Sequence, residues 1–291
     1  MCSSSSSIAA LIGQAFIEDN TEADVTTQSL CEGLGNDSPI KGALIAQQPM
    51  IVCGLGVVEA VFSYSLSPED ICFEKKVSDC QRIGAGEVLG YITTRPNILL
   101  SRERVALNFF QRLCGIATLT AEYVKRVEGC NARIVDTRKT VPTLRALDKY
   151  AVRCGGGYNH RFSLGDGCLI KDNHIKIAGG ITNAVAAVRK SKKLSHLIKI
   201  EVEAESMQDV KECIDAEVDC ILLDNMDTAQ LKEAVVFING RALVEASGGI
   251  TLSNVRSVAE TGVDLISVGG LTHSPRASDI SLEIETSRVK E

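Results

Sequence analysis

The sequence predicts an α/β protein whose second half folds as an incomplete parallel barrel. Between about residue 131 and residue 275, short apolar, β-rich runs alternate with helix-length segments, which is typical of βαβ units. Polar or glycine residues follow each run, so functional side chains are expected at the ends of several strands rather than at one switch point. Residues 8–130 mix helical and strand patterns without a repeating unit.

Six runs carry the strand signal in the second half. The last three lack strict alternation of apolar and polar residues, which is expected for strands buried on both faces. The runs are residues 132–135, 167–170, 197–200, 220–223, 242–244 and 264–268. Helices are expected between them at residues 181–193, 207–216, 227–238 and 254–260.

The first half gives two clearer signals. A glycine-rich stretch at 84–90 misses the dinucleotide-binding pattern and instead predicts a β-turn that leads into a strand at residues 88–93. A helix is expected to begin at Ser101, a residue type that caps helices, and to run to about Val127.

The spacing of the strand-end residues favours a barrel. Successive strand ends are 33, 32, 21, 23 and 22 positions apart, which is enough for a helical crossover but not for a separate domain. These strand ends are Arg138, Lys171, Glu203, Asp224, Ser247 and Gly269. Because the strands are few, we expect the barrel to be incomplete, with the amino-terminal half covering part of it.

Composition narrows the class of protein. The 291 residues are 45% hydrophobic and 23% charged, as in ordinary globular domains, and the net charge of −6 predicts no general nucleic-acid surface. No apolar run has the length of a membrane span, and residues 1–7 lack the features of a secretory signal. We therefore expect a cytoplasmic protein whose 11 cysteines are reduced and mostly buried. Their scattered spacing does not predict a zinc site.

Cations follow the first two predicted strands. Arg138 and Lys139 stand between two threonines, a pattern that suits a phosphate or carboxylate, although a solvated turn has the same composition. His160 and Arg161 follow three glycines, which permit close approach of the backbone to a ligand or simply form a flexible loop. Lys171 ends the next strand, where a lysine alone is unremarkable.

Carboxylates follow the next two strands. Strand side chains alternate, so Glu201 and Glu203 point to the same side, and Asp224 ends the neighbouring strand. Such carboxylates can hold Mg²⁺ or the hydroxyls of a ribose, since Mg²⁺ takes few protein oxygens beside substrate phosphates. They can equally be salt-bridge partners of the cations, and the two interpretations are compatible.

Glycines follow the last two strands. The Ser247-Gly248-Gly249 and Gly269-Gly270 segments lead toward helix starts and expose backbone N–H groups to an anion. Barrels often bind phosphate in this region, although tight turns between strand and helix would use the same residues.

These residues resemble the quinolinate phosphoribosyltransferase family. The resemblance runs from about Ile98 to Thr272 and more loosely through the amino-terminal half. The matching segments, in order, are 103–108, 115–118, 137–140, His160-Arg161, 171–174, 201–203, 223–225 and 245–250. One departure is that Val141 and Thr143 flank Pro142 where the family commonly has Thr and Gly, which leaves the shape of that loop open.

The resemblance implies a fold and an activity. The fold would be an amino-terminal α/β sandwich domain at 1–117, to which residues 275–291 return, and an open α/β barrel at 118–274. The reaction would condense quinolinate with phosphoribosyl pyrophosphate, using Mg²⁺, to give nicotinate mononucleotide, pyrophosphate and carbon dioxide in NAD synthesis. Members of the family are dimers or dimer-based oligomers in which each site borrows an arginine from its neighbour.

The resemblance also implies roles for single residues. Arg104 would be the residue lent across the dimer interface, while Glu203 and Asp224 would bind ribose hydroxyls or Mg²⁺. Lys139, Lys171, Glu203 and Asp224 would form the catalytic group. The contacts to quinolinate and the phosphates would come from Arg138, Lys139, His160, Arg161 and Lys171. The 5′-phosphate would lie against Ser247, Gly248, Gly249, Gly269 and Gly270.

Two other functions compete with this assignment. A relative with the same fold but another pyridine or base, such as the molybdate-associated paralogues, is disfavoured because the cations suit a dicarboxylate. A non-catalytic barrel that senses phosphorylated metabolites would not need the acid pair beside those cations. The paired acids of the other phosphoribosyltransferase fold are not found.

Overall fold

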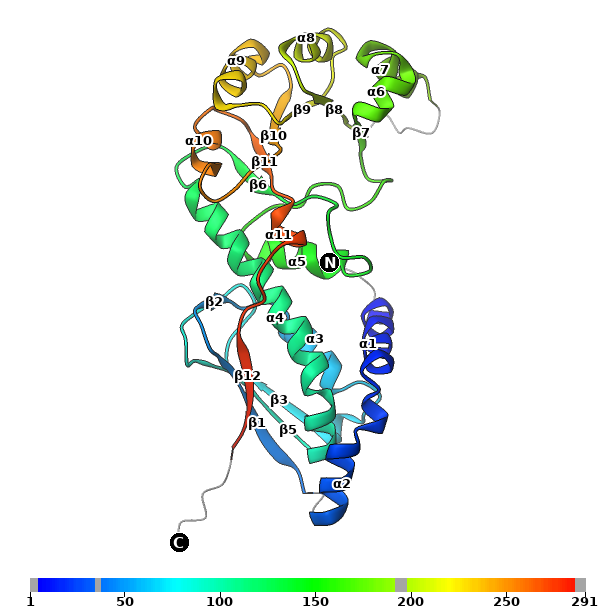
Figure 1. Cartoon of the computed structure of the whole chain (residues 1–291), viewed down its shortest axis with the longest axis vertical. Coiled ribbons are helices and arrows are strands. Elements are labelled where there is room, and N and C mark those ends of the chain that lie inside the picture. The colour runs from blue at the N-terminus through cyan, green and yellow to red at the C-terminus, as the bar shows by residue number, and fades with distance from the viewer. Residues whose placement is uncertain (1–4, 35–37, 192–197, 286–291) are drawn as a thin grey trace. The chain divides into compact units, whose positions relative to one another are not determined.

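The computed structural model describes residues 5–34, 38–191 and 198–285, which form two compact units (Figure 1). One unit contains the described residues before 120, residues 146–155 and the described residues after 274. The other contains residues 120–145 and 156–274 and is called the barrel unit below. Helix α4 (Pro96–Arg126) contributes residues to both.

A four-stranded antiparallel sheet forms one side of the first unit. Its strand order is β12 (Ile280–Ile284), β1 (Ile40–Ala46), β5 (Val88–Thr94) and β3 (Ile71–Lys75). A second, two-stranded sheet pairs β2 (Met50–Ile51) with β4 (Arg82–Ile83). The turn and strand expected at residues 84–93 are confirmed by β5.

Helices cover one face of the four-stranded sheet (Figure 1). The helices of this unit are α1 (Ser5–Asp19), α2 (Val25–Leu34), α3 (Leu55–Phe62), α4 and α5 (Arg145–Cys154), with 3-10 turns at Thr21–Ala23 and Pro68–Asp70. Between sheet and helices lies a core in which Leu44, Ile92, Phe62 and Phe110 are fully buried. The expected helix start at Ser101 is wrong. The helix begins at Pro96, because proline's fixed φ and missing N–H suit the first helical turn.

The chain returns to this unit near its carboxyl end. Strand β12 pairs with β1 in the register Leu44↔Leu282. Just before it, the Ser278 N–H donates to the carbonyl of Gln111 on α4 (2.9 Å). Gly115, one turn further along α4, lies so close to this segment that a Cβ there would be 2.1 Å from the carbonyl oxygen of Arg276. The close approach therefore requires glycine.

Gly115→Ala is expected to destabilise the protein by about 2–4 kcal/mol, because the added methyl must displace a backbone segment. In an unobstructed helix the same change would stabilise by about 0.5–1 kcal/mol. Gly33→Ala in α2 is the matched control, since a Cβ there meets nothing within 4 Å. Urea unfolding of both variants checks the sign, and equal midpoints for the two would contradict the assigned contact.

The barrel unit is built on a six-stranded parallel sheet. Its strand order is β6 (Arg133–Val135), β11 (Leu265–Ser267), β10 (Leu243–Ser247), β9 (Cys220–Asp224), β8 (Ile200–Ala204) and β7 (Cys168–Ile170). β6 and β7 are the edge strands of this order, so the barrel is open between them. The open α/β barrel expected from the spacing is confirmed.

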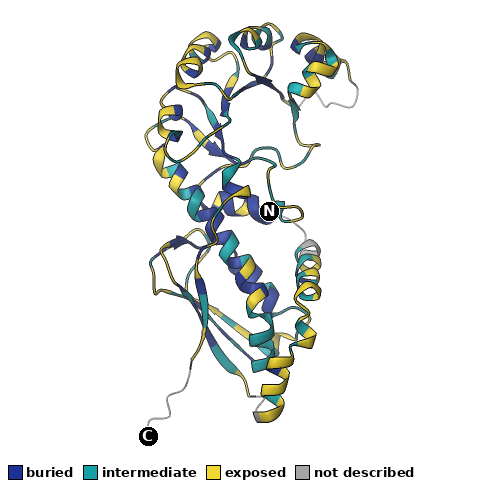
Figure 2. Ribbon diagram, in the orientation of Figure 1, coloured by how far each residue is buried: buried dark blue, intermediate teal, exposed yellow. Residues whose placement is uncertain are grey.

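Helices surround the outer face of this sheet (Figure 1). They are α6 (Asp172–Ala178), α7 (Ile181–Lys190), α8 (Met207–Asp215), α9 (Thr228–Ile238) and α10 (Val255–Ala259), with the short α11 (Gly270–His273) after β11. Figure 2 shows the strands buried and the outward sides of these helices exposed. Every residue of β8 is buried, as expected for a strand covered on both faces.

Two strands differ from their predicted positions: β10 continues to Ser247, beyond the run 242–244, and β8 lies later than its run. The run 197–200 was expected to be the strand, but β8 begins only at Ile200 and continues to Ala204, and Leu197 lies outside the described residues. The two glutamates made the segment after Ile200 look like a strand end. They remain inside the strand because cations pair with both of them, as described below.

Candidate active site

The carboxyl ends of the barrel strands carry the candidate site. Because all six strands are parallel, their carboxyl ends lie at one edge of the sheet. Lys139 follows β6 and Lys171 follows β7, while Glu203, Asp224 and Ser247 are at or near the ends of β8, β9 and β10. The strand register places Asp224 directly beside Ser247. The predicted strand-end residues therefore meet at one edge.

Two guanidinium groups lie close together beside this edge. The Arg161 Nη1 donates to the Gly167 carbonyl (3.2 Å), and its backbone N–H donates to His160 Nδ1 (2.8 Å). Burial, and then the neighbouring positive charge of Arg138, lower the pKa of Arg161. The Nε of Arg138 is buried and has no hydrogen-bond partner among the described residues. Two adjacent cations with unused donor capacity favour binding of an anion.

His160 is held between two buried glutamates. Its Nε2 lies 3.1 Å from Glu201 on β8 and 3.4 Å from Glu245 on β10. Its backbone N–H donates to the buried carboxylate of Asp136 (3.0 Å). Burial alone would lower the pKa of His160, but the hydrogen bonds and charges of the accepting carboxylates of Glu201 and Glu245 outweigh burial and raise the pKa to about 10. The imidazole is therefore a cation at neutral pH.

A second group contains one lysine and three carboxylates. The Lys171 Nζ lies 2.7 Å from Glu203 Oε2. Glu203, Glu205 and Asp224 each offer a carboxylate oxygen, and these atoms lie within 4.8 Å of one another. Oxygen ligands in such a group suit Mg²⁺. The salt-bridge and the metal-binding interpretations of Glu203 are thus compatible in the same geometry.

The glycine loops after β10 and β11 are tightly constrained. Gly248 has φ +92°, and a Cβ there would lie 2.2 Å from Asn225 Oδ1, so the turn requires glycine. A Cβ on Gly269 would lie 3.0 Å from Lys139 Cδ. The Thr272 hydroxyl donates to the Lys139 carbonyl (2.8 Å), which fixes the β6 loop against α11. Lys139 and the second glycine loop therefore form one surface.

Two family models together match most of the chain. The model of the quinolinate phosphoribosyl transferase C-terminal domain matches residues 116–283, and that of the N-terminal domain matches residues 24–114. The chain belongs to the quinolinate phosphoribosyl transferase family. The expected family is confirmed, and the barrel edge described above lies within the match to the C-terminal domain.

Relatives of this quinolinate phosphoribosyl transferase chain match over nearly its whole length. A Bacillus subtilis protein named as a probable nicotinate-nucleotide pyrophosphorylase (carboxylating) is 40% identical over 277 residues, covering 95% of this chain and 93% of the relative. The Mycobacterium leprae protein of that name is 39% identical over 264 residues, 90% of this chain and 91% of the relative. The Ehrlichia chaffeensis enzyme structure has a TM-score of 0.90 and 38% identity, covering 98% and 100% of the two chains.

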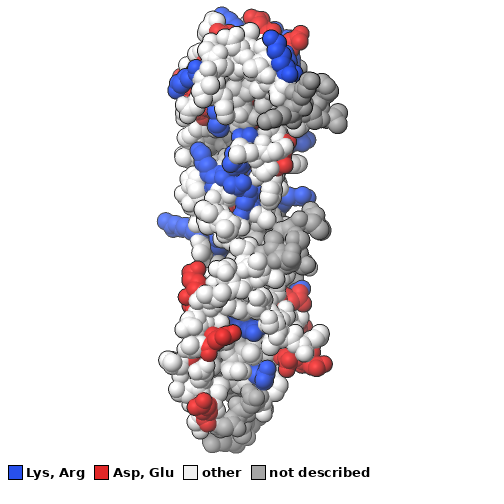
Figure 3. Space-filling model, turned by 90° about the vertical axis from the view of Figure 1, so that its right-hand side faces the viewer, with Lys and Arg blue, Asp and Glu red and all other residues white. Residues whose placement is uncertain are grey.

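Arg104 differs in position from the other predicted residues of this quinolinate phosphoribosyl transferase chain. It lies on α4 in the first unit, where its side chain is exposed. The remaining predicted residues all belong to the barrel unit. Figure 3 shows Lys and Arg side chains clustered in one part of the face that it displays, and Asp and Glu side chains elsewhere on the same face. The cations are thus concentrated locally in a chain whose net charge is −6.

Sequence reasoning missed several residues of this quinolinate phosphoribosyl transferase site. Glu245 appears in the sequence analysis only within a matching segment. A carboxylate inside a buried strand indicates a buried partner, and this signal could have identified it. Glu205 is also missed, because its place beside Glu203 and Asp224 depends on the neighbouring strand β9.

In the described residues, no helix combines the length and apolar character needed to cross a bilayer.

Replacement of Glu245 by Gln is expected to lower the pKa of His160, because one of the two carboxylates that hold the imidazolium loses its charge. The raised pKa stabilises the folded state fully below about pH 6.5, the value for free histidine, and this stabilisation is lost as pH rises through about 10. NMR titration of the His160 ring and the alkaline limb of the kcat/KM profile should both shift to lower pH in the variant. Glu283→Gln, at an exposed position, is the control. Titration of wild-type His160 near 6.5 would contradict the buried triad.

Proposed function

We propose that this chain condenses quinolinate with phosphoribosyl pyrophosphate to give nicotinate mononucleotide, pyrophosphate and carbon dioxide, a step of de novo NAD biosynthesis. One observation carries the proposal. A cationic group of Arg138, Arg161 and protonated His160 shares one barrel edge with the Glu203 and Asp224 carboxylates. The first group suits a dicarboxylate and the second a ribose. The names of the relatives support the same reaction.

The cationic group addresses the main obstacle to the reaction. Quinolinate carries two carboxylates and its co-substrate carries several phosphate charges, so the two repel each other unless cations are placed between them. Arg138 has a buried, unused Nε donor, and Arg161 and the His160 imidazolium add two positive charges. We assign these three residues to the carboxylates of quinolinate.

The other strand ends suit the phosphoribosyl group. Glu203 and Asp224 would accept hydrogen bonds from the ribose hydroxyls, and Lys139 and Lys171 would contact the phosphates. The loops after β10 and β11 would hold the 5′-phosphate against backbone N–H groups. Their residues are Ser247, Gly248, Gly249, Gly269 and Gly270.

The carboxylate group also fits a magnesium ion. Glu203, Glu205 and Asp224 present oxygens close enough to share one ion, and Mg²⁺ commonly takes one or two protein carboxylates together with substrate phosphates. When bound, the ion would supply charge neutralisation for the departing pyrophosphate. Lys171 already pairs with Glu203, so the lysine orients that carboxylate.

The side chains of this protein position the substrates and neutralise their charges, and none of them forms a covalent bond with a substrate. The lone pair of the quinolinate nitrogen forms a bond to ribose C1′ while the C1′–O bond to pyrophosphate breaks and its electron pair leaves with the pyrophosphate. Positive charge that builds on the ribose lies near Glu203 and Asp224. The resulting pyridinium accepts the electron pair released when the adjacent C–CO₂ bond breaks, and a proton then replaces carbon dioxide on the ring. Orientation and desolvation supply the catalysis.

We further propose that the enzyme is a cytoplasmic homodimer or dimer-based oligomer in which Arg104 serves the site of the neighbouring subunit. The exposed position of Arg104 on α4, in the unit that does not contain the barrel edge, supports this assignment. A shared arginine would add one more cation to the dicarboxylate pocket.

Pyrophosphate release by the purified protein tests the assignment. We expect release from phosphoribosyl pyrophosphate only when quinolinate and Mg²⁺ are both present. Equal activity with nicotinate, which lacks the second carboxylate, would contradict the substrate and favour a paralogue that acts on another pyridine.

A further inference from the structure

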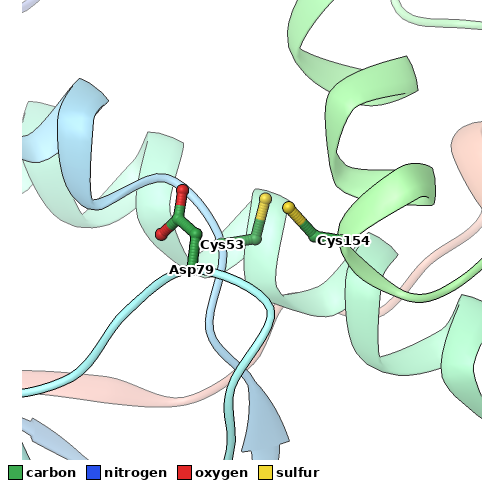
Figure 4. A group of neighbouring side chains, drawn as sticks. All are labelled: Cys53, Asp79 and Cys154. Carbon is green, nitrogen blue, oxygen red and sulfur yellow. The ribbon is translucent and has the colours of Figure 1, made fainter.

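A group of two cysteines and one aspartate lies in the first unit and shares no residue with the barrel edge. Cys53 stands just before α3, Asp79 lies between β3 and β4, and Cys154 ends α5 (Figure 4). The two sulfur atoms and a carboxylate oxygen of Asp79 all lie within 4.8 Å of one another. Figure 4 shows the two sulfur atoms pointing toward each other. Three ligand atoms therefore converge from segments that are distant in the sequence.

We propose that Cys53, Asp79 and Cys154 form a binding site for a thiophilic divalent cation of the zinc type. Thiolate sulfur selects Zn²⁺ over Mg²⁺, and zinc also accepts a carboxylate oxygen. In a tetrahedral site with Zn–S bonds of about 2.3 Å, two thiolates lie about 3.8 Å apart. That separation is within the span of the group.

Asp79 is already fixed in position. Its Oδ1 accepts hydrogen bonds from the backbone N–H groups of Gly54 (3.0 Å) and Leu55 (3.1 Å). Its Oδ2 accepts from the Tyr150 hydroxyl (2.7 Å). A carboxylate offers about four lone-pair sites, so one on Oδ2 remains for a cation. Such outer contacts orient the ligands of many protein metal sites.

The two cysteines are held as firmly as the aspartate. Cys53 is fully buried, and its backbone N–H donates to the sulfur of Cys114 (3.3 Å). The Cys114 thiol in turn lies 3.5 Å from the Cys53 carbonyl as a donor. Cys154 is also buried. The group therefore needs little rearrangement to bind an ion.

The charge balance favours a cation at this place. A divalent cation would displace the protons of the two thiols and balance two of the three negative charges that the two thiolates and the carboxylate then carry.

The residue next to Asp79 is a candidate for the fourth ligand. Cys80 follows Asp79 directly and is exposed. Its backbone has φ +72°, an uncommon value for a residue other than glycine, and its N–H donates to the Val52 carbonyl (2.8 Å). Asp79 also lines a cavity of about 420 Å³ together with Leu55 and Gly56. Cys80 or a water molecule would complete the tetrahedron.

The test uses the purified full chain, stripped with a chelator under reducing conditions and titrated with Co²⁺ in excess Mg²⁺, which occupies the active-site carboxylates. We expect one equivalent of Co²⁺ to give thiolate-to-metal charge-transfer absorption that Zn²⁺ abolishes. Cys53→Ser and Cys154→Ser should lose this absorption. Asp79→Asn, which keeps the acceptor for Gly54 and Leu55, should weaken binding by about tenfold or more.

The controls separate the site from general thiol chemistry. Cys213→Ser, at a buried cysteine of α8, and Cys72→Ser, at an exposed cysteine of β3, should retain the absorption. Circular dichroism of each variant verifies that it folds. Absorption that persists in Cys154→Ser would overturn the proposal. A Cys53–Cys154 disulfide in protein purified without reductant, with no bound metal, would also overturn it and assign the pair a redox role. Neither result would affect the proposed transferase activity, which rests on the barrel unit.

Discussion

Arg104→Ala and Lys139→Ala are each expected to lower kcat/KM by about 10²- to 10³-fold, because each change removes a cation from a site that stabilises a multiply anionic transition state. Neither change should unfold the protein, since both side chains are exposed. Steady-state kinetics of the two purified variants, with circular dichroism as a check of folding, measure the effect. Arg126→Ala, at an exposed arginine near the end of the same helix, is the control and should remain near wild type.

Mixing the two variants tests whether the site is shared. In a dimer of one Arg104→Ala chain and one Lys139→Ala chain, one site receives both wild-type residues and the other receives neither. Random reassembly should therefore restore roughly one quarter of wild-type activity. Absence of recovery, after subunit exchange has been verified, would place Arg104 in the site of its own subunit or outside the site.

Glu203→Gln and Asp224→Asn are expected to lower kcat by at least about 10²-fold, since both remove negative charge from beside the ribose carbon that becomes positive. Glu203→Gln also removes the partner of Lys171, which lies 2.7 Å away, so its effect should be the larger of the two. Both substitutions preserve the shape of the side chain, while one acceptor oxygen is replaced by an NH₂ donor. The measurement is kcat and KM for both substrates across a Mg²⁺ titration.

Glu205→Gln separates metal binding from ribose chemistry. Glu205 belongs to the same group of carboxylates but is exposed, and the proposed ribose contacts do not involve it. We expect this variant to require more Mg²⁺ while reaching a kcat near wild type at saturation. If Glu205→Gln loses as much kcat as Asp224→Asn at every Mg²⁺ concentration, Glu205 does not act through the metal alone. Unchanged rates in all three variants would contradict the assignment of these carboxylates to the active site.

The barrel edge is the part of the site that the sequence predicts best. Arg138, Lys171 and Asp224 are recognisable because a charged residue after a buried strand occupies a fixed place in a parallel barrel. The length of β8 was mispredicted for a related reason. Glu201 and Glu203 look like the end of a strand, and only their cationic partners, which are distant in the sequence, explain their burial within it.

Other features depend on contacts that no spacing rule reveals. Glu245 pairs with His160 across 85 positions of the sequence, and the pair forms only because β10 lies near the loop between α5 and β7. The group of Cys53, Asp79 and Cys154 joins two loops and the end of a helix, so its members show none of the short spacings typical of zinc ligands. The scattered cysteines therefore predict no zinc site from spacing, and the site proposed here rests on proximity in the folded chain alone.

Carbon dioxide release tests the central claim most directly. Purified protein would be supplied with phosphoribosyl pyrophosphate, Mg²⁺ and quinolinate labelled at the carboxylate next to the ring nitrogen. We predict that labelled carbon dioxide and pyrophosphate appear in equal amounts, because formation of the pyridinium drives loss of the carboxylate. Pyrophosphate release without labelled carbon dioxide would contradict the proposed reaction, and so would carbon dioxide release that does not require phosphoribosyl pyrophosphate.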